Sequence, residues 1–169
     1  CERIFTKCKK SNDDKFNQYF QMLNQEFIFL KKNWPKNLPK AIIHGDLFKE
    51  NIFFIENKIS GVIDFYFACE DFIAYELALT VNDCCFDTKN NFIIKNYFAL
   101  LEGFNKYSTL SKDENKNFNT LLRGAAVRIL VTRLYDTIYN PDDAIVIPKE
   151  PLQYLNILKW HQQNTNFNI

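Results

Sequence analysis

The sequence lacks the cysteine and histidine arrangements that mark disulfide-rich or zinc-binding proteins. Its five cysteines form no C-x-x-C pair and are odd in number, and the chain has only two histidines. Small secreted scaffolds carry paired cysteines, and structural zinc sites need several Cys or His ligands at short spacings. We therefore expect free thiols, a reducing cytoplasmic location and no zinc centre.

A surplus of charge of one sign and long apolar runs are also missing. Lys and Arg number 21 and Asp and Glu 20, which leaves a net charge of +1. So small a surplus excludes the broad positive field on which non-specific nucleic-acid binding depends. No apolar run approaches the roughly 18 residues of a membrane span, and no charged segment followed by an apolar one opens the chain. We expect neither nucleic acid nor a membrane as a partner.

What the chain does contain is sufficient for one globular domain over residues 1–169. Its hydrophobic fraction is 47%, it has 17 phenylalanines and only 4 glycines, and no repeat or linker divides it. Residues 1–12 carry no clear pattern and form a poorly specified lead-in. Because the chain begins with Cys1 rather than Met, we expect it to be part of a longer protein.

The spacing of apolar residues predicts helices around a small β-hairpin. Apolar positions three and four apart predict helices over residues 13–34, 72–85, 91–107, 121–139 and 151–162. The polar cluster 111–117 is expected to be a break, and residues 11–14 supply cap candidates for the first helix. Short β-rich runs predict strands over 41–43, 52–55 and 59–63, the last two flanking a turn at 56–58. The predicted fold class is α+β and mostly helical.

The segment that carries chemistry is the loop after the first predicted strand. His44, Asp46 and Asn51 have the spacing H-x-D-x-x-x-x-N, and Asp64 follows thirteen residues later at the end of the hairpin. This is the spacing of a kinase catalytic loop, in which the Asp accepts the proton of the attacking hydroxyl and the Asn binds Mg²⁺. Because a hairpin returns on itself, Asp64 should lie beside Asn51, so that two oxygen ligands suited to Mg²⁺ meet next to a carboxylate base. His44 would support the loop by hydrogen bonding.

The loop and its surroundings resemble the aminoglycoside phosphotransferase and choline kinase superfamily, and within it the bacterial homoserine kinases. The resemblance covers nearly the whole chain from about residue 15 and rests on WPKNLP at 34–39, IHGDLF at 43–48, IDFYFAC at 63–69, RGAAVR at 123–128 and PKEP at 148–151. It implies the C-terminal lobe of a protein-kinase-like fold, with the hairpin carrying the catalytic and metal-binding loops. It also implies Asp46 as catalytic base, Asn51 and Asp64 as magnesium ligands, and ATP and Mg²⁺ as cofactors.

The resemblance further implies a small-molecule alcohol as substrate, homoserine first, in threonine biosynthesis. A kinase holds ATP between two lobes. No Gly-rich phosphate loop and no strand-borne Lys precede the catalytic loop in this sequence. We therefore expect the N-terminal kinase lobe to be absent from the chain and to be its missing partner, and the chain alone to be inactive.

Arginines are the candidates for binding the carboxylate of such an acceptor. Arg123 and Arg128 lie on or near the apolar face of the helix predicted over 121–139. An arginine on a buried face needs a partner, so a structural ion pair is the alternative. Arg133 and Asp136 are three residues apart and are expected to pair with each other.

Two further residues have a functional and a structural interpretation. Tyr66 could line the substrate pocket, although an aromatic run such as 65–67 is more often part of a core. Glu76 could accept a hydrogen bond from the catalytic loop or complement the amino end of its helix, and we favour structural support.

Other functions fit parts of the sequence. A choline or ethanolamine kinase calls for an aromatic cage and an aminoglycoside kinase for an acidic cleft, and two Trp and a balanced charge favour neither. A non-catalytic remnant or binding module is the alternative from another class. In that case residues 44–46 form a polar turn, and Asn51 and Asp64 merely cap a strand and a helix.

Overall fold

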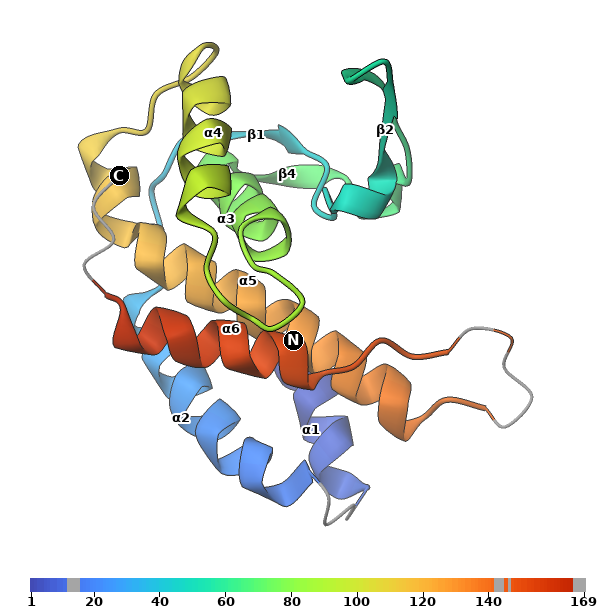
Figure 1. The fold of residues 1–169 in the computed structure, drawn as a ribbon. Coiled ribbons are helices and arrows are strands. Elements are labelled where there is room, and N and C mark those ends of the chain that lie inside the picture. The colour runs from blue at the N-terminus through green and yellow to red at the C-terminus, as the bar shows by residue number, and fades with distance from the viewer. Residues whose placement is uncertain (12–15, 142–144, 146, 166–169) are drawn as a thin grey trace.

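The computed structural model describes residues 1–11, 16–141, 145 and 147–165, and it is mainly helical with two small sheets (Figure 1). In chain order the elements are α1 (Glu2–Lys10), α2 (Asn17–Asn33), β1 (Lys40–Ile43), η2 (Lys49–Asn51), β2 (Ile52–Ile55), β3 (Lys58–Val62), η3 (Phe65–Phe67), β4 (Cys69–Phe72), α3 (Ile73–Cys84), α4 (Ile94–Asn105), α5 (Lys112–Ile138) and α6 (Leu152–Gln163). Both η elements are 3₁₀ helices. The mixed, mostly helical fold class is confirmed.

Helix α5 lies at the centre of the core and packs against α1, α2, α3 and α6. Its first turn is fixed by a capping box: the Ser111 side chain accepts from the Glu114 N–H, and the Glu114 carboxylate accepts from the Ser111 N–H. The predicted break over 111–117 is therefore wrong. A polar cluster that contains such a pair starts a helix instead of separating two, so α5 begins at Lys112 and not at 121.

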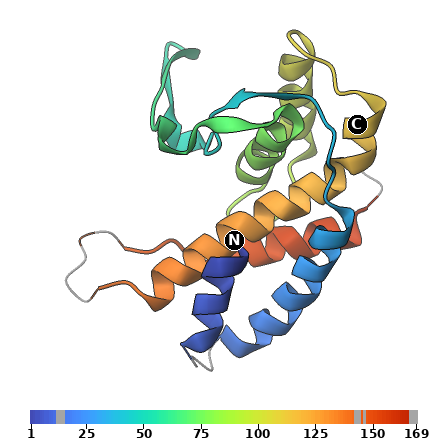
Figure 2. The same cartoon turned by 180° about the vertical axis from the view of Figure 1, so that it is seen from behind.

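The remaining predicted helices are confirmed as α2, α3, α4 and α6, with ends shifted by a few residues. The cap candidates at positions 12–14 and the predicted start at 13 lie outside the described residues. Helix α1 was not predicted, yet it belongs to the core. Its Phe5 and Cys8 are buried, and the Phe5 ring centre lies 5.8 Å from that of Phe20 and 5.0 Å from that of Phe27. Figure 2 shows α1 and α2 together on one side of α5.

Two antiparallel pairs of strands frame the loop of interest. The predicted hairpin is confirmed: β2 pairs with β3 with Ile52 opposite Val62, and the turn residues Glu56 and Asn57 have positive φ. Strand β4 was not predicted and pairs with β1, so that Ile43 lies opposite Cys69. The chain thus leaves β1, runs through the loop and hairpin, and returns beside its starting point.

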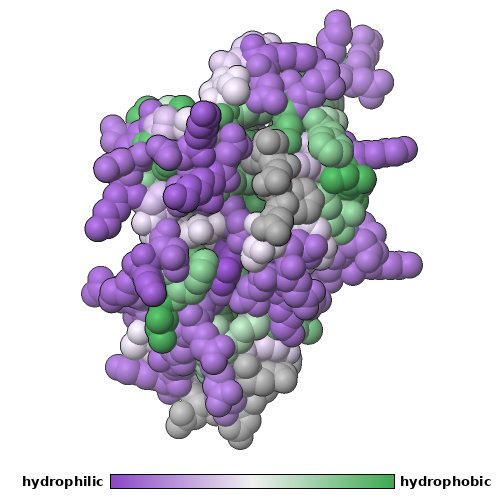
Figure 3. Space-filling view, turned by 90° about the vertical axis from the view of Figure 1, so that its left-hand side faces the viewer, coloured by the Kyte–Doolittle hydropathy of each residue, from purple (hydrophilic) through white to green (hydrophobic). Residues whose placement is uncertain are grey.

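The molecular surface is mainly polar on the side seen in Figure 3, with separate apolar residues between charged ones. Within the described ranges, the structure contains no helix that is both long and apolar enough to cross a membrane. The hairpin projects away from the helical body (Figure 1) and exposes several large apolar side chains.

Candidate active site

The loop between β1 and β2 brings the predicted site residues together. After Ile43 the chain turns at Gly45, the Phe48 N–H donates to the Asp46 carbonyl over 2.9 Å, and η2 follows directly. At the far end of the hairpin the Ile63 N–H donates to the Asn51 carbonyl over 3.0 Å. This backbone bond places Asp64, the next residue, beside the end of the loop.

Gly45 has a positive φ of 75°, and a Cβ built on it would lie 2.6 Å from the Phe67 carbonyl oxygen. Only glycine adopts this conformation at so close an approach without strain. The peptide groups around it are held from two helices. The Gly45 N–H donates to Glu76 Oε2 of α3 over 2.8 Å, and Arg128 of α5 donates to the Gly45 carbonyl. Glu76 therefore contacts the loop that carries Asp46 directly, rather than only complementing its own helix.

His44 connects the loop to the residue before Asp64. Its Nδ1 accepts from the Asp46 N–H over 3.3 Å, so the ring proton belongs on Nε2, which donates to the Ile63 carbonyl over 2.8 Å. The ring is buried and its centre lies 4.5 Å from that of Phe65. The imidazole thus ties the loop that carries Asp46 to the end of the hairpin.

Asp46 carries the carboxylate at the centre of the site. Its Oδ1 lies 3.4 Å from Arg128 Nη2, and the side chains of Asp46 and Arg128 are only 17% and 21% exposed. Burial raises the pKa of Asp46; Arg128 opposes this rise and the nearby Asp64 carboxylate adds to it. A partly desolvated carboxylate beside a cation and a second carboxylate is an arrangement suited to holding and accepting a proton.

Asn51 and Asp64 present oxygen atoms next to this carboxylate. The buried Asn51 donates its Nδ2 to the Asp46 carbonyl over 2.9 Å, which leaves its Oδ1 as a possible ligand atom. Asp64 is exposed and has the left-handed φ of 66°. Over the described part of the chain, no three His, Cys, Asp or Glu side chains gather as a metal centre. A cation here would thus take few ligands from this chain.

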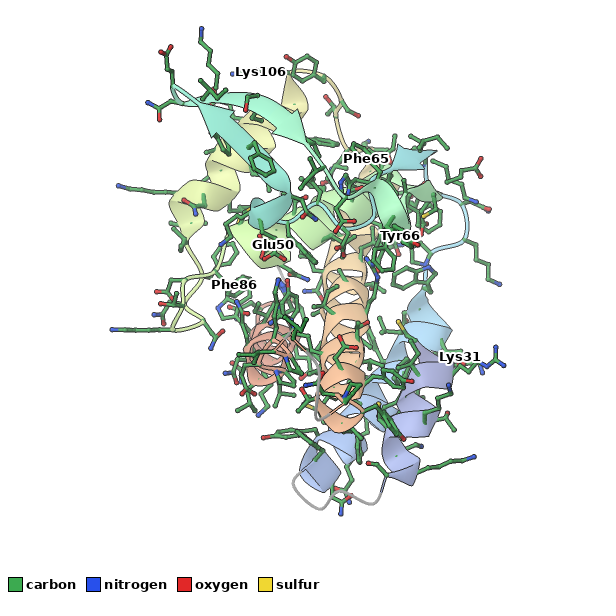
Figure 4. All side chains as sticks on the ribbon, turned by 90° about the vertical axis from the view of Figure 1, so that its right-hand side faces the viewer. Lys31, Glu50, Phe65, Tyr66, Phe86 and Lys106 are labelled. Atoms are coloured by element: carbon green, nitrogen blue, oxygen red, sulfur yellow. The ribbon has the colours of Figure 1, made fainter. Side chains whose placement is uncertain are left out.

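Some predicted residues lie elsewhere or have other partners. Arg123 pairs with the buried Glu26 through two bonds of 2.7 Å, which is the structural alternative, so its guanidinium is not available to a substrate. Tyr66, which is labelled in Figure 4, is 93% exposed and therefore does not belong to the core. The predicted pair of Arg133 with Asp136 is wrong. Arg133 donates instead to the Glu150 carbonyl and to Gln153.

Two contacts at the site were not predicted from sequence. The Lys49 N–H donates to Asp83 Oδ2 of α3 over 2.8 Å, and Lys149 pairs with Glu50 of η2. No local pattern signals either one, because the partners are 34 and 99 residues apart. The PKEP segment is visible in the sequence, but the contact of its Lys149 with η2 is not.

Comparisons with known proteins show which family the chain resembles. The profile described as "Phosphotransferase enzyme family" matches residues 3–108. The chain is 43% identical over 137 residues to a homoserine kinase of Sinorhizobium fredii, which is 81% of this chain and 42% of that protein. Homoserine kinases of Xanthobacter autotrophicus (46% over 137 residues, 81% of this chain, 43% of the relative) and Parvibaculum lavamentivorans (42% over 159 residues, 94% and 50%) are also similar.

The chain spans about half the length of the curated relatives it matches. The family match, in contrast, covers well over half of the chain itself and includes the whole loop from His44 to Asp64. With the loop, the hairpin and their supporting contacts arranged as described, the chain belongs to the phosphotransferase enzyme family.

Proposed function

We propose that the protein transfers the terminal phosphoryl group of ATP to the hydroxyl of a small molecule, with homoserine as the acceptor. The observation that carries the proposal is the loop in which Asp46, Asn51 and Asp64 lie together, supported from α3 and α5. The similar proteins named homoserine kinase support the choice of acceptor.

In this proposal Asp46 orients the acceptor hydroxyl and accepts its proton as the new bond to phosphorus forms. Arg128 keeps the carboxylate in place and opposes the rise of its pKa that burial causes. Glu76 and His44 fix the backbone on either side, so that the carboxylate does not have to be positioned anew in each turnover. Most of the catalysis in this class comes from such positioning and from charge neutralisation.

The residues present fit a magnesium ion. Asn51 Oδ1 and the Asp64 carboxylate are hard oxygen donors at neighbouring ends of the hairpin, and Mg²⁺ commonly takes one or two protein ligands and keeps its waters. When bound with ATP, the ion would neutralise charge on the phosphate oxygens. The chain's own part is to hold the Asn51 side chain in place through the bond from its Nδ2 to the Asp46 backbone carbonyl.

We also propose that the chain is the carboxyl-terminal lobe of the kinase and that a second lobe covers the hairpin and the nucleotide. The support is the exposed apolar surface on this side, including Phe53, Phe54, Ile59 and Phe65, each at least half exposed. An apolar patch of this kind marks an interaction site in a folded protein. The relatives' greater length provides room for such a lobe.

The test measures L-homoserine-dependent ADP release with Mg·ATP, using the protein at its natural length. Asp46→Asn should lower kcat by about 10²-fold or more, the usual contribution of a general base, whereas Asp113→Asn on the first turn of α5 should not. An unchanged rate for Asp46→Asn would show that Asp46 is not the base. If the wild type releases no ADP in response to homoserine, homoserine is not the acceptor. If residues 1–169 alone release ADP at ordinary kinase rates, the proposal that a second lobe is needed is refuted.

A further inference from the structure

The short segment 147–151, which we call the linking segment, leads into α6 and is anchored to α5. Arg133 Nη1 donates to the Glu150 carbonyl over 3.1 Å and to Gln153 Oε1 over 2.8 Å, and its guanidinium lies 4.5 Å from the centre of the Tyr154 ring. The Leu152 N–H donates to the Glu150 side chain. The backbone next to Lys149 is therefore fixed from both α5 and α6.

From this anchored position Lys149 reaches across to the catalytic loop. Its ammonium group pairs with the Glu50 carboxylate in η2, one residue before Asn51. Glu50 lies close enough to Asp46 for its charge to raise the pKa of that carboxylate further. Figure 4 labels Glu50 on the side of the loop that faces α6. The Lys149–Glu50 pair thus connects the helical layer to the loop next to the base.

The Lys149–Glu50 ion pair is weak enough for Lys149 to exchange Glu50 for another anion. The Lys149 and Glu50 side chains are 53% and 56% exposed, and an exposed ion pair contributes only about 0–1 kcal/mol. The ammonium group of a lysine is a compact charge on a flexible stem, so it can move from one anion to another by rotation of the side chain alone. Arg128, which lies beside Asp46, is by contrast already engaged with the Gly45 carbonyl and the Asp46 carboxylate.

The charge at this part of the site calls for a cation. The Glu50 and Asp64 carboxylates lie close enough to Asp46 for their negative charges to act on it, so an acceptor that brings its own carboxylate is repelled there unless a positive group meets it. We propose that Lys149 leaves Glu50 to bind the carboxylate of the amino-acid acceptor, and that Glu50 holds the ammonium in place until then. This assignment rests on the proposed function, because it requires an acceptor that is both an alcohol and an acid.

Steady-state kinetics with Mg·ATP and L-homoserine test the proposal on the protein at its natural length. Lys149→Met should raise the KM for homoserine about tenfold or more, the size of a lost charge-assisted hydrogen bond, with kcat and the KM for ATP changed by less than about twofold. Lys149→Arg, which keeps the charge, should recover most of the affinity. Lys159→Met, at an exposed position of α6, is the matched control and should leave all constants unchanged.

Glu50→Gln separates binding from mere support of the loop. If Lys149 only stabilises the loop through its ion pair, Glu50→Gln will raise the homoserine KM as much as Lys149→Met does, which overturns the proposal. If Lys149 binds the acceptor, Glu50→Gln removes the carboxylate that competes for Lys149 and will not raise the homoserine KM. If Lys149→Met lowers kcat and leaves the homoserine KM unchanged, the Lys149 charge acts on the phosphoryl group instead of the acceptor, which also overturns the proposal. If the wild type turns over homoserine and Lys149→Met leaves its constants unchanged, only this role of Lys149 is refuted. If the wild type does not turn over homoserine, the proposed function itself is refuted.

Discussion

Acid should destabilise the protein through one buried histidine, His161 of α6. Its Nε2–H donates to Asn82 Oδ1 of α3 over 2.7 Å, and Asn82 Nδ2 donates in turn to the Leu122 carbonyl of α5 over 2.9 Å. This chain joins three helices and requires the neutral imidazole. Its Nδ1 is buried and has no hydrogen-bond partner among the residues that the structure describes, so a second proton would find no acceptor there.

Burial, assisted by the positive charge of Arg123, lowers the pKa of His161 from 6.5 to about 3. The unfolded chain therefore binds a proton below pH 6.5 that the folded chain refuses until about pH 3, and stability falls as the pH falls through this window. Integrating the linkage relation from pH 6.5 to about pH 4.5 gives a loss of about 2 kcal/mol from this group alone.

The perturbation is His161→Gln, which keeps an amide donor toward Asn82 but does not titrate. Urea unfolding at a series of pH values, followed by the fluorescence of the neighbouring Trp160, gives the free energy of unfolding for both proteins. The ring of Trp160 lies 4.4 Å from that of Phe92 and 5.2 Å from that of His161, so its emission should change on unfolding. The wild type should lose about 2 kcal/mol more than the variant over this range. Parallel curves for the two proteins would refute the reasoning.

Two further substitutions test the core. Glu26→Gln leaves the charge of Arg123 buried without its partner and should cost about 3–5 kcal/mol in urea unfolding, while adding Arg123→Met should restore part of the loss; an unchanged single variant would contradict the role of the pair. Gly124→Ala should cost about 1–3 kcal/mol, because its Cβ would lie 2.2 Å from the Trp34 ring, whereas Gly103→Ala, with open space around it, should be neutral or stabilising in thermal unfolding. Equal effects at both glycines would contradict the contact.

Local patterns predicted most of the helices and strands but missed α1 and β4, as well as the two 3₁₀ helices. Helix α1 has only nine residues, and Lys7, Lys9 and Lys10 leave too few apolar positions for a period to stand out. Strand β4 has four residues and no alternation of polar and apolar side chains, so only its pairing with β1 marks it as a strand. Both are stabilised by contacts to distant segments, which their own residues do not encode.

The sequence by itself determined the residues whose spacing is local. Short-range backbone geometry determines how the loop carries the chain from Asp46 to Asn51. It also determines how the hairpin returns the chain to Asp64. The family resemblance rests on the same residues. Turn and strand preferences act over a few residues, so they can be recognised without knowing the rest of the chain.

Only the tertiary structure decided which charged side chains meet. Arg123 and Arg128 lie on one helix five residues apart, yet the first pairs with the buried Glu26 and the second with Asp46 in the loop after β1. Which partner each finds depends on how α5 is rotated and packed among its neighbours, and many packed side chains fix that rotation together. For the same reason, the contact of Lys149 with Glu50 could be found only once the helices and the hairpin were in place.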